Sequence, residues 1–109
     1  MISIDDFIKV EIRVGTIIEA AVNRKASKPA YKLKIDLGTE IGMKRSSAQI
    51  TELYTPEDLI GKQVLCCVNL IPMHIGDIKS EVRILGTDSA QGIVLVSPDE
   101  KVENGDLLC

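Results

Sequence analysis

The chain has 109 residues, of which 45% are hydrophobic and 27% are charged. This length and balance predict a single globular domain over residues 1–109 with a real core, and they exclude a disordered chain. No apolar run reaches the roughly 18 residues that a membrane helix needs, so membrane insertion is not expected. The chain starts with the acidic stretch Met1 to Asp6, where a signal peptide is basic, which predicts a soluble cytoplasmic protein.

The three cysteines do not form a recognisable framework. Cys66 and Cys67 are neighbours in an apolar run, and adjacent residues of a strand point to opposite faces, so they cannot form an ordinary disulfide. His74 is the only histidine, and no Cys-x-x-Cys spacing occurs, so no structural zinc site is predicted. We expect neither a metal nor another cofactor.

Catalysis is not expected either. The sequence contains no phosphate-binding loop, dinucleotide fingerprint or nucleophile elbow. His74 follows Pro72-Met73 without a neighbouring serine or cysteine, and the sixteen carboxylates are scattered along the chain. We therefore predict that the protein is not an enzyme.

The cations are concentrated in one part of a chain whose formal net charge is −3. Residues 22–50 hold seven cations and two anions, whereas from residue 51 onward ten anions outnumber four cations. Such a segment can present a local anion-binding face, although solvated strand and loop faces are the simpler interpretation. The seven cations are Arg24, Lys25, Lys28, Lys32, Lys34, Lys44 and Arg45.

The first half of the chain is typical of β-strands separated by short breaks. Ser3 to Ile8 predicts one helical turn with Ser3 as its N-cap. Strict alternation from Lys9 to Val14 predicts a strand that continues to Ala20, in which Gly15 is interpreted as a bulge or sharp bend. After a polar loop from Val22 to Ala30, Tyr31 to Leu37 alternates apolar and polar residues. A hairpin loop from Gly38 to Gly42 and a return strand from Met43 to Ala48 follow.

The second half contains the only substantial predicted helix. We expect it over Gln49 to Leu59, because Thr55-Pro56-Glu57 is a start signal and Gly61 suits its end. Val64 to Leu70 is apolar on both faces, which indicates a central or interface strand that Pro72 ends. Further strands are predicted at residues 81–85 and 92–96, and a turn at residues 104–105 precedes a short apolar end.

This order of elements predicts the fold. It is typical of an all-β, five-stranded Greek-key barrel of the OB type, with a short helix between strands 3 and 4 and N- and C-terminal extensions. An SH3-like barrel is the alternative, but the inserted helix disfavours it.

The aromatic content limits the kind of nucleic acid that such a barrel would bind. Only Phe7, Tyr31 and Tyr54 are aromatic, whereas single-strand binders stack bases on several rings. Structured RNA recognised through its phosphates fits better, because it needs no stacking. In an OB barrel, strands 2 and 3 and the loop between strands 1 and 2 form the usual ligand surface, and the seven cations fall in these segments.

Asp6-Phe7 and the run from Ile12 to Ile17 resemble the opening of the tRNA-binding-domain family, which includes the C-terminal domain of bacterial methionyl-tRNA synthetase. The residues from Gly42 to Tyr54 are more narrowly similar to the CsaA branch of this family, small proteins described as export-related chaperones. The resemblance covers nearly the whole chain and continues through Tyr31–Leu33, Asp36–Gly38, Leu59–Val64, Asn69–Pro72 and Lys79–Glu81.

The resemblance implies an OB fold with terminal extensions, a homodimer built through them, tRNA binding on the barrel and, for the CsaA branch, binding of unfolded or precursor polypeptides for export. It places tRNA-associated positions on Asn69, Ser80 and Glu81, next to Lys79. Relatives often follow Ser-Glu with Gly-Met, whereas Val82-Arg83 stands here, which favours the CsaA branch. The full set of tRNA-binding candidates is Arg24, Lys25, Lys28, Lys32, Lys34, Lys44, Arg45, Asn69, Lys79, Ser80 and Glu81.

Polypeptide binding needs an apolar surface with an adaptable lining, which methionine supplies. The candidates precede the last strands of the barrel, and simple core packing is the alternative for them: Ile71, Met73, Ile75 and Ile78. Because residues 64–68 leave no polar face, a second copy is expected to cover part of the barrel, unless the chain ends do so. The dimer candidates are Phe7, Ile8, Leu65, Cys67, Leu107 and Leu108.

Three functions are therefore compared. The first is a chaperone that binds unfolded or precursor polypeptides, and the second is a structure-selective tRNA-binding protein that acts in trans on tRNA or a synthetase. The third is a dimeric scaffold for another protein, for which the sequence names no partner.

Overall fold

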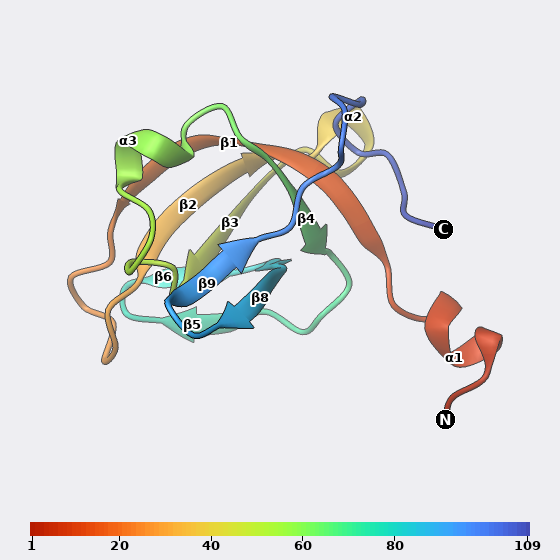
Figure 1. Cartoon of the computed structure of the whole chain (residues 1–109), viewed down its shortest axis with the longest axis horizontal. Helices are drawn as coiled ribbons and strands as arrows, with labels where there is room; N and C mark the ends of the chain where they lie inside the picture. The colour runs from red at the N-terminus through yellow and green to blue at the C-terminus, as the bar shows by residue number, and fades with distance from the viewer.

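A computed structural model describes residues 1–109, in which antiparallel strands curl into a nearly closed barrel (Figure 1). The main sheet has five strands in the order β3-β2-β1-β4-β7, and two further hairpins pair β5 with β6 and β8 with β9. The elements are α1 (Ile4–Ile8), β1 (Ile12–Val22), β2 (Tyr31–Asp36), α2 (Gly38–Ile41), β3 (Met43–Ala48), α3 (Pro56–Leu59), β4 (Gln63–Cys67), β5 (Met73–Ile75), β6 (Ile78–Ser80), β7 (Arg83–Ile84), β8 (Gly86–Ser89) and β9 (Gly92–Leu95).

The barrel closes between β3 and the segment that enters β7. The backbone N–H groups of Glu81 and Val82 donate to the carbonyl of Arg45 at 2.8 and 3.4 Å. Together with α3, which lies between β3 and β4, this arrangement confirms the predicted OB-like fold.

The long strand β1 carries the curvature of the barrel. Its first half pairs with β4 over residues 12–16, and its second half pairs with β2 over residues 16–22. The register shifts between Ile17 and Glu19, so the irregularity does not lie at Gly15. Gly15 is instead a close-packing position, because a Cβ there would stand 2.6 Å from Ile35 Cγ2 and 2.8 Å from Leu37 Cδ2.

The core lies inside the barrel and follows the predicted alternation. Tyr31, Leu33, Ile35 and Leu37 are buried, while the residues between them are partly exposed, as expected of β2. The core continues through Ile17, Ile50, Leu59, Val64, Cys66 and Val82. The strand predicted over residues 64–70 is found as β4, which ends at Cys67, three residues earlier than predicted. Both Cys66 and Cys67 are buried, so both of its faces are covered.

The predicted helix over residues 49–59 is wrong in its first half. Only α3 is helical: Thr55 caps it, and the Thr55 and Asp58 side chains each accept the other's backbone N–H. Residues 38–41, predicted as a hairpin loop, form the one-turn helix α2. The β5–β6 hairpin and β8 were not predicted, because strands of three or four residues are too short to show a period.

The two chain ends lie outside the barrel. α1 is capped by Ser3 as predicted and buries none of its residues, and it projects beside the barrel in Figure 1. The last residues run along β1, where Arg13 bridges to Leu107 and Leu108 N–H donates to the Ile12 carbonyl at 2.9 Å. No helix has the length and apolar character that crossing a bilayer requires.

Candidate functional site

The predicted cations on β2 and β3 do not all share one face. In the antiparallel register, Lys34 stands opposite Arg45 and Lys32 opposite Ser47, and directly opposed residues share a face. These side chains alternate with the buried Leu33 and Ile35, so Lys32, Lys34 and Arg45 lie on the outer face of the sheet.

Lys44 is turned away from that group. It stands opposite the buried Ile35, which places it on the other face of β3, and its Nζ lies 3.7 Å from Glu81 Oε2. Lys79 on β6 stands opposite His74, and both are exposed on the β5–β6 hairpin.

The remaining predicted cations lie in the loop between β1 and β2. Arg24, Lys25 and Lys28 are all exposed, and the first and last of these line an open hollow of about 600 Å³ with the buried Asn23. Lys32 follows this loop by two residues, and Asn23 Nδ2 in the loop donates to Ser47 Oγ, opposite Lys32, at 3.1 Å, so the loop adjoins the outer face. Six of the seven predicted cations thus lie on the outer face or in the adjoining loop, and we call them the basic face: Arg24, Lys25, Lys28, Lys32, Lys34 and Arg45.

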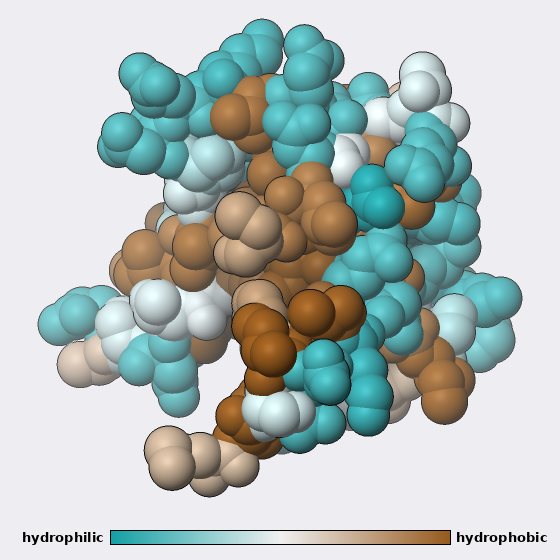
Figure 2. Space-filling view, turned by 90° about the vertical axis from the view of Figure 1, so that its right-hand side faces the viewer, coloured by the Kyte–Doolittle hydropathy of each residue, from teal (hydrophilic) through white to brown (hydrophobic).

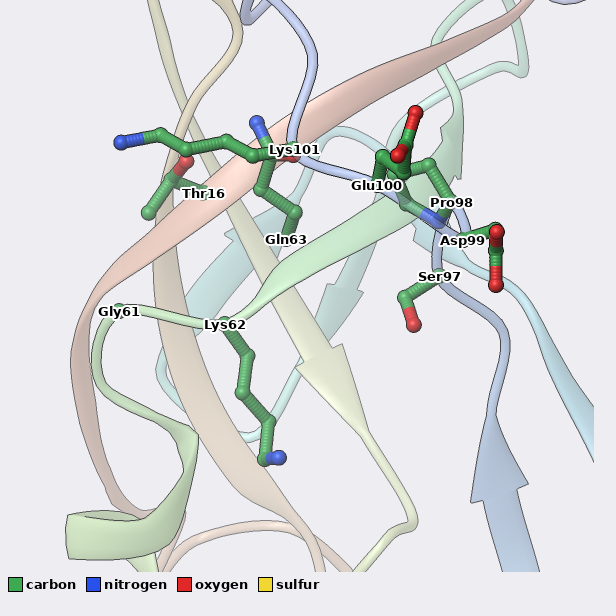
Figure 3. A pocket seen from close by; sticks show the side chains of 9 residues that line it. All are labelled: Thr16, Gly61, Lys62, Gln63, Ser97, Pro98, Asp99, Glu100 and Lys101. Carbon is green, nitrogen blue, oxygen red and sulfur yellow. The ribbon is translucent and has the colours of Figure 1, made fainter.

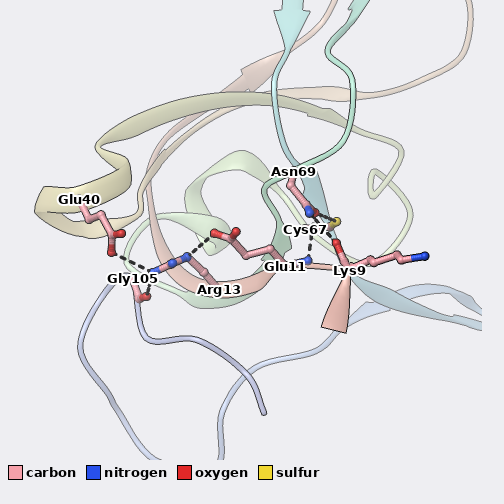
Figure 4. A network of polar contacts seen from close by, with 7 residues as sticks. All are labelled: Lys9, Glu11, Arg13, Glu40, Cys67, Asn69 and Gly105. Carbon is pink, nitrogen blue, oxygen red and sulfur yellow. Dashed lines mark hydrogen bonds and ion pairs between the residues drawn. The ribbon is translucent and has the colours of Figure 1, made fainter. Parts of the chain in front are cut away.

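The polar residues that the resemblance associated with tRNA make internal contacts. Asn69 Oδ1 accepts the Glu11 N–H at 3.0 Å, and its Nδ2 donates to the Lys9 carbonyl at 2.7 Å (Figure 4). Ser80 Oγ accepts the Ser47 N–H at 3.0 Å, and Glu81 Oε1 accepts the Arg45 N–H at 3.1 Å. Asn69 therefore fixes the chain between α1 and β1, and the other two fasten β6 to β3.

The apolar candidates form a small pocket beside this junction. Ile71, Met73 and Ile75 line a hollow of about 100 Å³, together with Leu70 and Val82. Its polar rim consists of Ser47, Ser80, Glu81 and Arg83. We call this hollow the apolar pocket.

Three of the four predicted apolar residues thus come together, and Ile78 does not. Ile78 is buried on β6 and does not line the pocket, so core packing describes it. Leu70 and Val82 were missed, because they were assigned to the predicted strands at residues 64–70 and 81–85, whereas β4 ends at Cys67 and β7 begins at Arg83. The signal that could be seen in the sequence was the group of apolar residues with an adaptable methionine between Ile71 and Ile75.

The predicted dimer residues differ in how much surface they offer. Phe7, Ile8 and Leu107 are exposed, and Leu65 and Leu108 are half-buried. Cys67 is buried within the chain, and its Sγ lies 3.5 Å from Asn69 Oδ1, so it has little surface to give to a partner. Figure 2 shows apolar side chains gathered across the middle of the face that carries α1 and the chain ends.

A network around Arg13 ties the C-terminal segment to the barrel (Figure 4). Arg13 Nε donates to Glu11 Oε2 at 2.7 Å, and its Nη1 donates to Glu40 Oε2 at 3.2 Å and to the Gly105 carbonyl at 2.9 Å. The hydrogen bond to Glu11 raises the pKa of Arg13 above its usual value. These hydrogen bonds hold β1, α2 and the C-terminal turn together.

A third hollow, of about 370 Å³, is polar and lies where the C-terminal segment crosses β4 (Figure 3). Gln63 Nε2 donates to the Val102 carbonyl at 2.7 Å, and Gln63 Oε1 accepts the Val102 N–H at 3.0 Å. The side chains of Lys62 and Lys101 point away from each other, so they do not converge on a common ligand. This hollow is therefore formed by the attachment of the C-terminal segment to β4 and is not assigned a ligand.

The titratable sulfur and imidazole groups do not form a cluster. Burial raises the pKa of the Cys66 thiol to about 12, and Cys109 is exposed at the chain end. His74 is exposed on β5. No three His, Cys, Asp or Glu side chains come together as a possible metal site.

The nearly closed barrel, with a helix between β3 and β4, is an OB-like fold. Residues 12–107 match the family described as putative tRNA binding domain, and the chain belongs to that family. Two solved structures are similar over their full length. The CsaA chaperone protein from Picrophilus torridus is 46% identical with a TM-score of 0.95, and each chain is covered completely. Chaperone CsaA from Bacillus anthracis is 42% identical, with 100% of this chain and 99% of that chain covered and a TM-score of 0.92.

A much longer protein is also related. The methionine–tRNA ligase of Methanococcoides burtonii is 39% identical over 106 residues, which are 96% of this chain and 15% of the ligase. The chain thus corresponds to a small part of the ligase. These findings confirm the resemblance read from the sequence: this is a tRNA-binding-domain protein of the CsaA type.

Proposed function

We propose that this protein is a chaperone that binds unfolded or precursor polypeptides, for export, through the apolar pocket. The observation that carries the proposal is the exposure of Leu70, Ile71 and Met73 at the mouth of one hollow. Large apolar side chains gathered on a protein surface mark interaction sites. Full-length similarity to the two CsaA chaperones supports it.

The shape of the pocket indicates how a polypeptide would bind. A volume of about 100 Å³ suits one aliphatic side chain at a time, which matches a ligand without a fixed sequence. Met73 can change its rotamer to fit different side chains, and the polar rim keeps the surroundings hydrated. Polypeptides that have buried their apolar side chains by folding would no longer bind.

An aggregation assay tests this function. At an equimolar ratio, the protein should suppress aggregation of a chemically unfolded client protein and should not bind the same client protein in its native state. Failure to suppress aggregation at that ratio would contradict the chaperone proposal.

The basic face supports a second function. The protein would bind tRNA or another folded RNA structure-selectively and would act in trans on tRNA or a synthetase. Six cations lie on the outer face of β2 and β3 or in the adjoining β1–β2 loop, and no aromatic side chain is exposed among them, which favours contacts to phosphates. Fluorescence anisotropy should show tighter binding of a folded tRNA than of an unstructured RNA of equal length, weakening steeply with salt. Charge reversal at Lys32 and Lys34 should weaken tRNA binding. Unchanged affinity would contradict a role of the basic face in binding RNA.

The ends of the chain support a homodimer. α1 buries none of its own residues, and Ile4, Phe7, Ile8 and Leu107 are exposed. Figure 2 shows apolar side chains gathered on the face of the molecule that carries α1 and the chain ends. A second copy would cover these side chains. Sedimentation should therefore give twice the mass of one chain, and Ile8→Asp should shift the protein toward the monomer; a wild-type monomer would contradict the proposal.

We further propose that residues 1–109 work as one domain in the cytoplasm, without catalytic activity of their own. Three free thiols suit a reducing compartment.

A further inference from the structure

We propose that Asp77, at the tip of the β5–β6 hairpin, restricts RNA binding by occupying Lys32 on the basic face. The inference rests on the RNA-binding function proposed above. Asp77 Oδ2 lies 3.6 Å from Lys32 Nζ, whereas the other five cations of the basic face form no ion pair within the chain. Lys32 is thus the one cation of this face that already has an anionic partner.

The hairpin tip holds this carboxylate in place. Asn23 is 3% exposed, and its Nδ2 donates to the Ile75 carbonyl at 3.0 Å and to Ser47 Oγ at 3.1 Å. Gly76 has a φ of +64°, and a Cβ there would overlap Asn23 Oδ1 and stand 2.8 Å from Ala26 N. Because the tip packs directly on the β1–β2 loop, the backbone that carries Asp77 is held beside Lys32.

Asp77 stands where the β1–β2 loop leads into β2. Its neighbour Gly76 packs against the backbone of Lys25 and Ala26, while Asp77 itself reaches Lys32 at the start of β2. A phosphate that reaches Lys32 therefore meets the negative charge of Asp77 and must displace it.

This ion pair lowers the affinity of the basic face for RNA. A phosphate that pairs with Lys32 must first break the contact between Lys32 and Asp77, so the contribution of Lys32 to binding is reduced by the cost of that step. Asp77 therefore limits the affinity for any RNA whose phosphates reach Lys32.

Neutralising Asp77 tests the proposal. We expect Asp77→Asn to bind a folded tRNA about two- to fivefold more tightly near physiological salt, the range set by one partly exposed ion pair. The slope of log affinity against log salt should steepen by about 0.7–0.9, the value for one more phosphate contact. The unstructured RNA of equal length should gain no more than the tRNA, because the full gain goes to an RNA whose phosphate already had to break the ion pair with Lys32.

Two further variants locate the effect. Asp99→Asn makes the same change of charge in the polar hollow beside Lys62, and it should leave RNA affinity nearly unchanged. In the Lys32→Met background, Asp77→Asn should lose most of its effect, because the cation that it releases is gone. Melting curves of all variants show whether each one is folded.

The outcomes separate this inference from the function on which it rests. If wild-type protein binds tRNA and Asp77→Asn binds it equally or more weakly, the role of Asp77 is overturned. The same holds if Asp99→Asn has the same effect as Asp77→Asn. If neither the wild type nor Asp77→Asn binds RNA, the proposed RNA-binding function itself fails.

Discussion

Replacing Met73 by serine should weaken polypeptide binding without unfolding the protein. Met73 is 65% exposed at the apolar pocket, and that exposed fraction is what a bound side chain would cover. Fully burying a methionine side chain is worth about 1.5–3 kcal/mol, so the exposed fraction corresponds to about 1–2 kcal/mol. Loss of that contribution weakens the affinity about 5- to 30-fold. Because the side chain is mostly in water, the stability should change by no more than about 0.5 kcal/mol.

The assay is fluorescence anisotropy with a labelled, permanently unfolded polypeptide, and thermal melting confirms that each variant is folded. Ile60→Ser is the matched control, because Ile60 is 50% exposed after α3 and does not line the apolar pocket. Equal affinity of Met73→Ser and wild type would refute the reasoning. An equal loss of affinity in Ile60→Ser would show that general surface hydrophobicity, and not the pocket, binds the polypeptide.

Three further predictions concern stability and assembly. Because the pKa of Cys66 rises from 9.0 to about 12 on burial, the folded state keeps a proton that the unfolded state loses, so stability should fall above pH 9. The slope is about 1.4 kcal/mol per pH unit, and urea unfolding of Cys66→Val should lack it; identical slopes would contradict this account. Gly15→Ala should cost about 1–3 kcal/mol in urea unfolding, because its Cβ would stand 2.6 Å from Ile35 Cγ2, and a neutral result would mean that the barrel relaxes there. Asn69→Ala should favour the monomer in sedimentation and leave tRNA affinity within about twofold, because its amide holds the chain next to α1; a selective loss of tRNA binding would reverse this assignment.

The parts of the fold that could be predicted are those with a local signal. Alternation over Tyr31–Asp36 defined β2, and the Thr55-Pro56 pair defined the start of α3. The short hairpins give no such signal, because three or four residues cannot show a period. Gly15 illustrates a different limit, since a bulge and a close approach of two strands call for the same residue.

The site was predicted in part for similar reasons. The group of apolar residues with an adaptable methionine between Ile71 and Ile75 could be seen in the sequence, whereas the burial of Ile78 depends on the hairpin turn. Lys44 and Arg45 are adjacent on one strand, and strand geometry alone already places them on opposite faces. The Asp77–Lys32 ion pair carries no signal in the sequence, because it joins residues that only the tertiary fold brings together.

Hydrogen–deuterium exchange with and without an unfolded polypeptide tests the central claim, that the apolar pocket binds polypeptides, most directly. The account predicts slower exchange of the amides from Leu70 to Ile75 and from Ser80 to Arg83 when polypeptide is bound, with the polar hollow around Gln63 unchanged. Protection that appears elsewhere and spares the pocket, or no protection at saturating polypeptide, would contradict it.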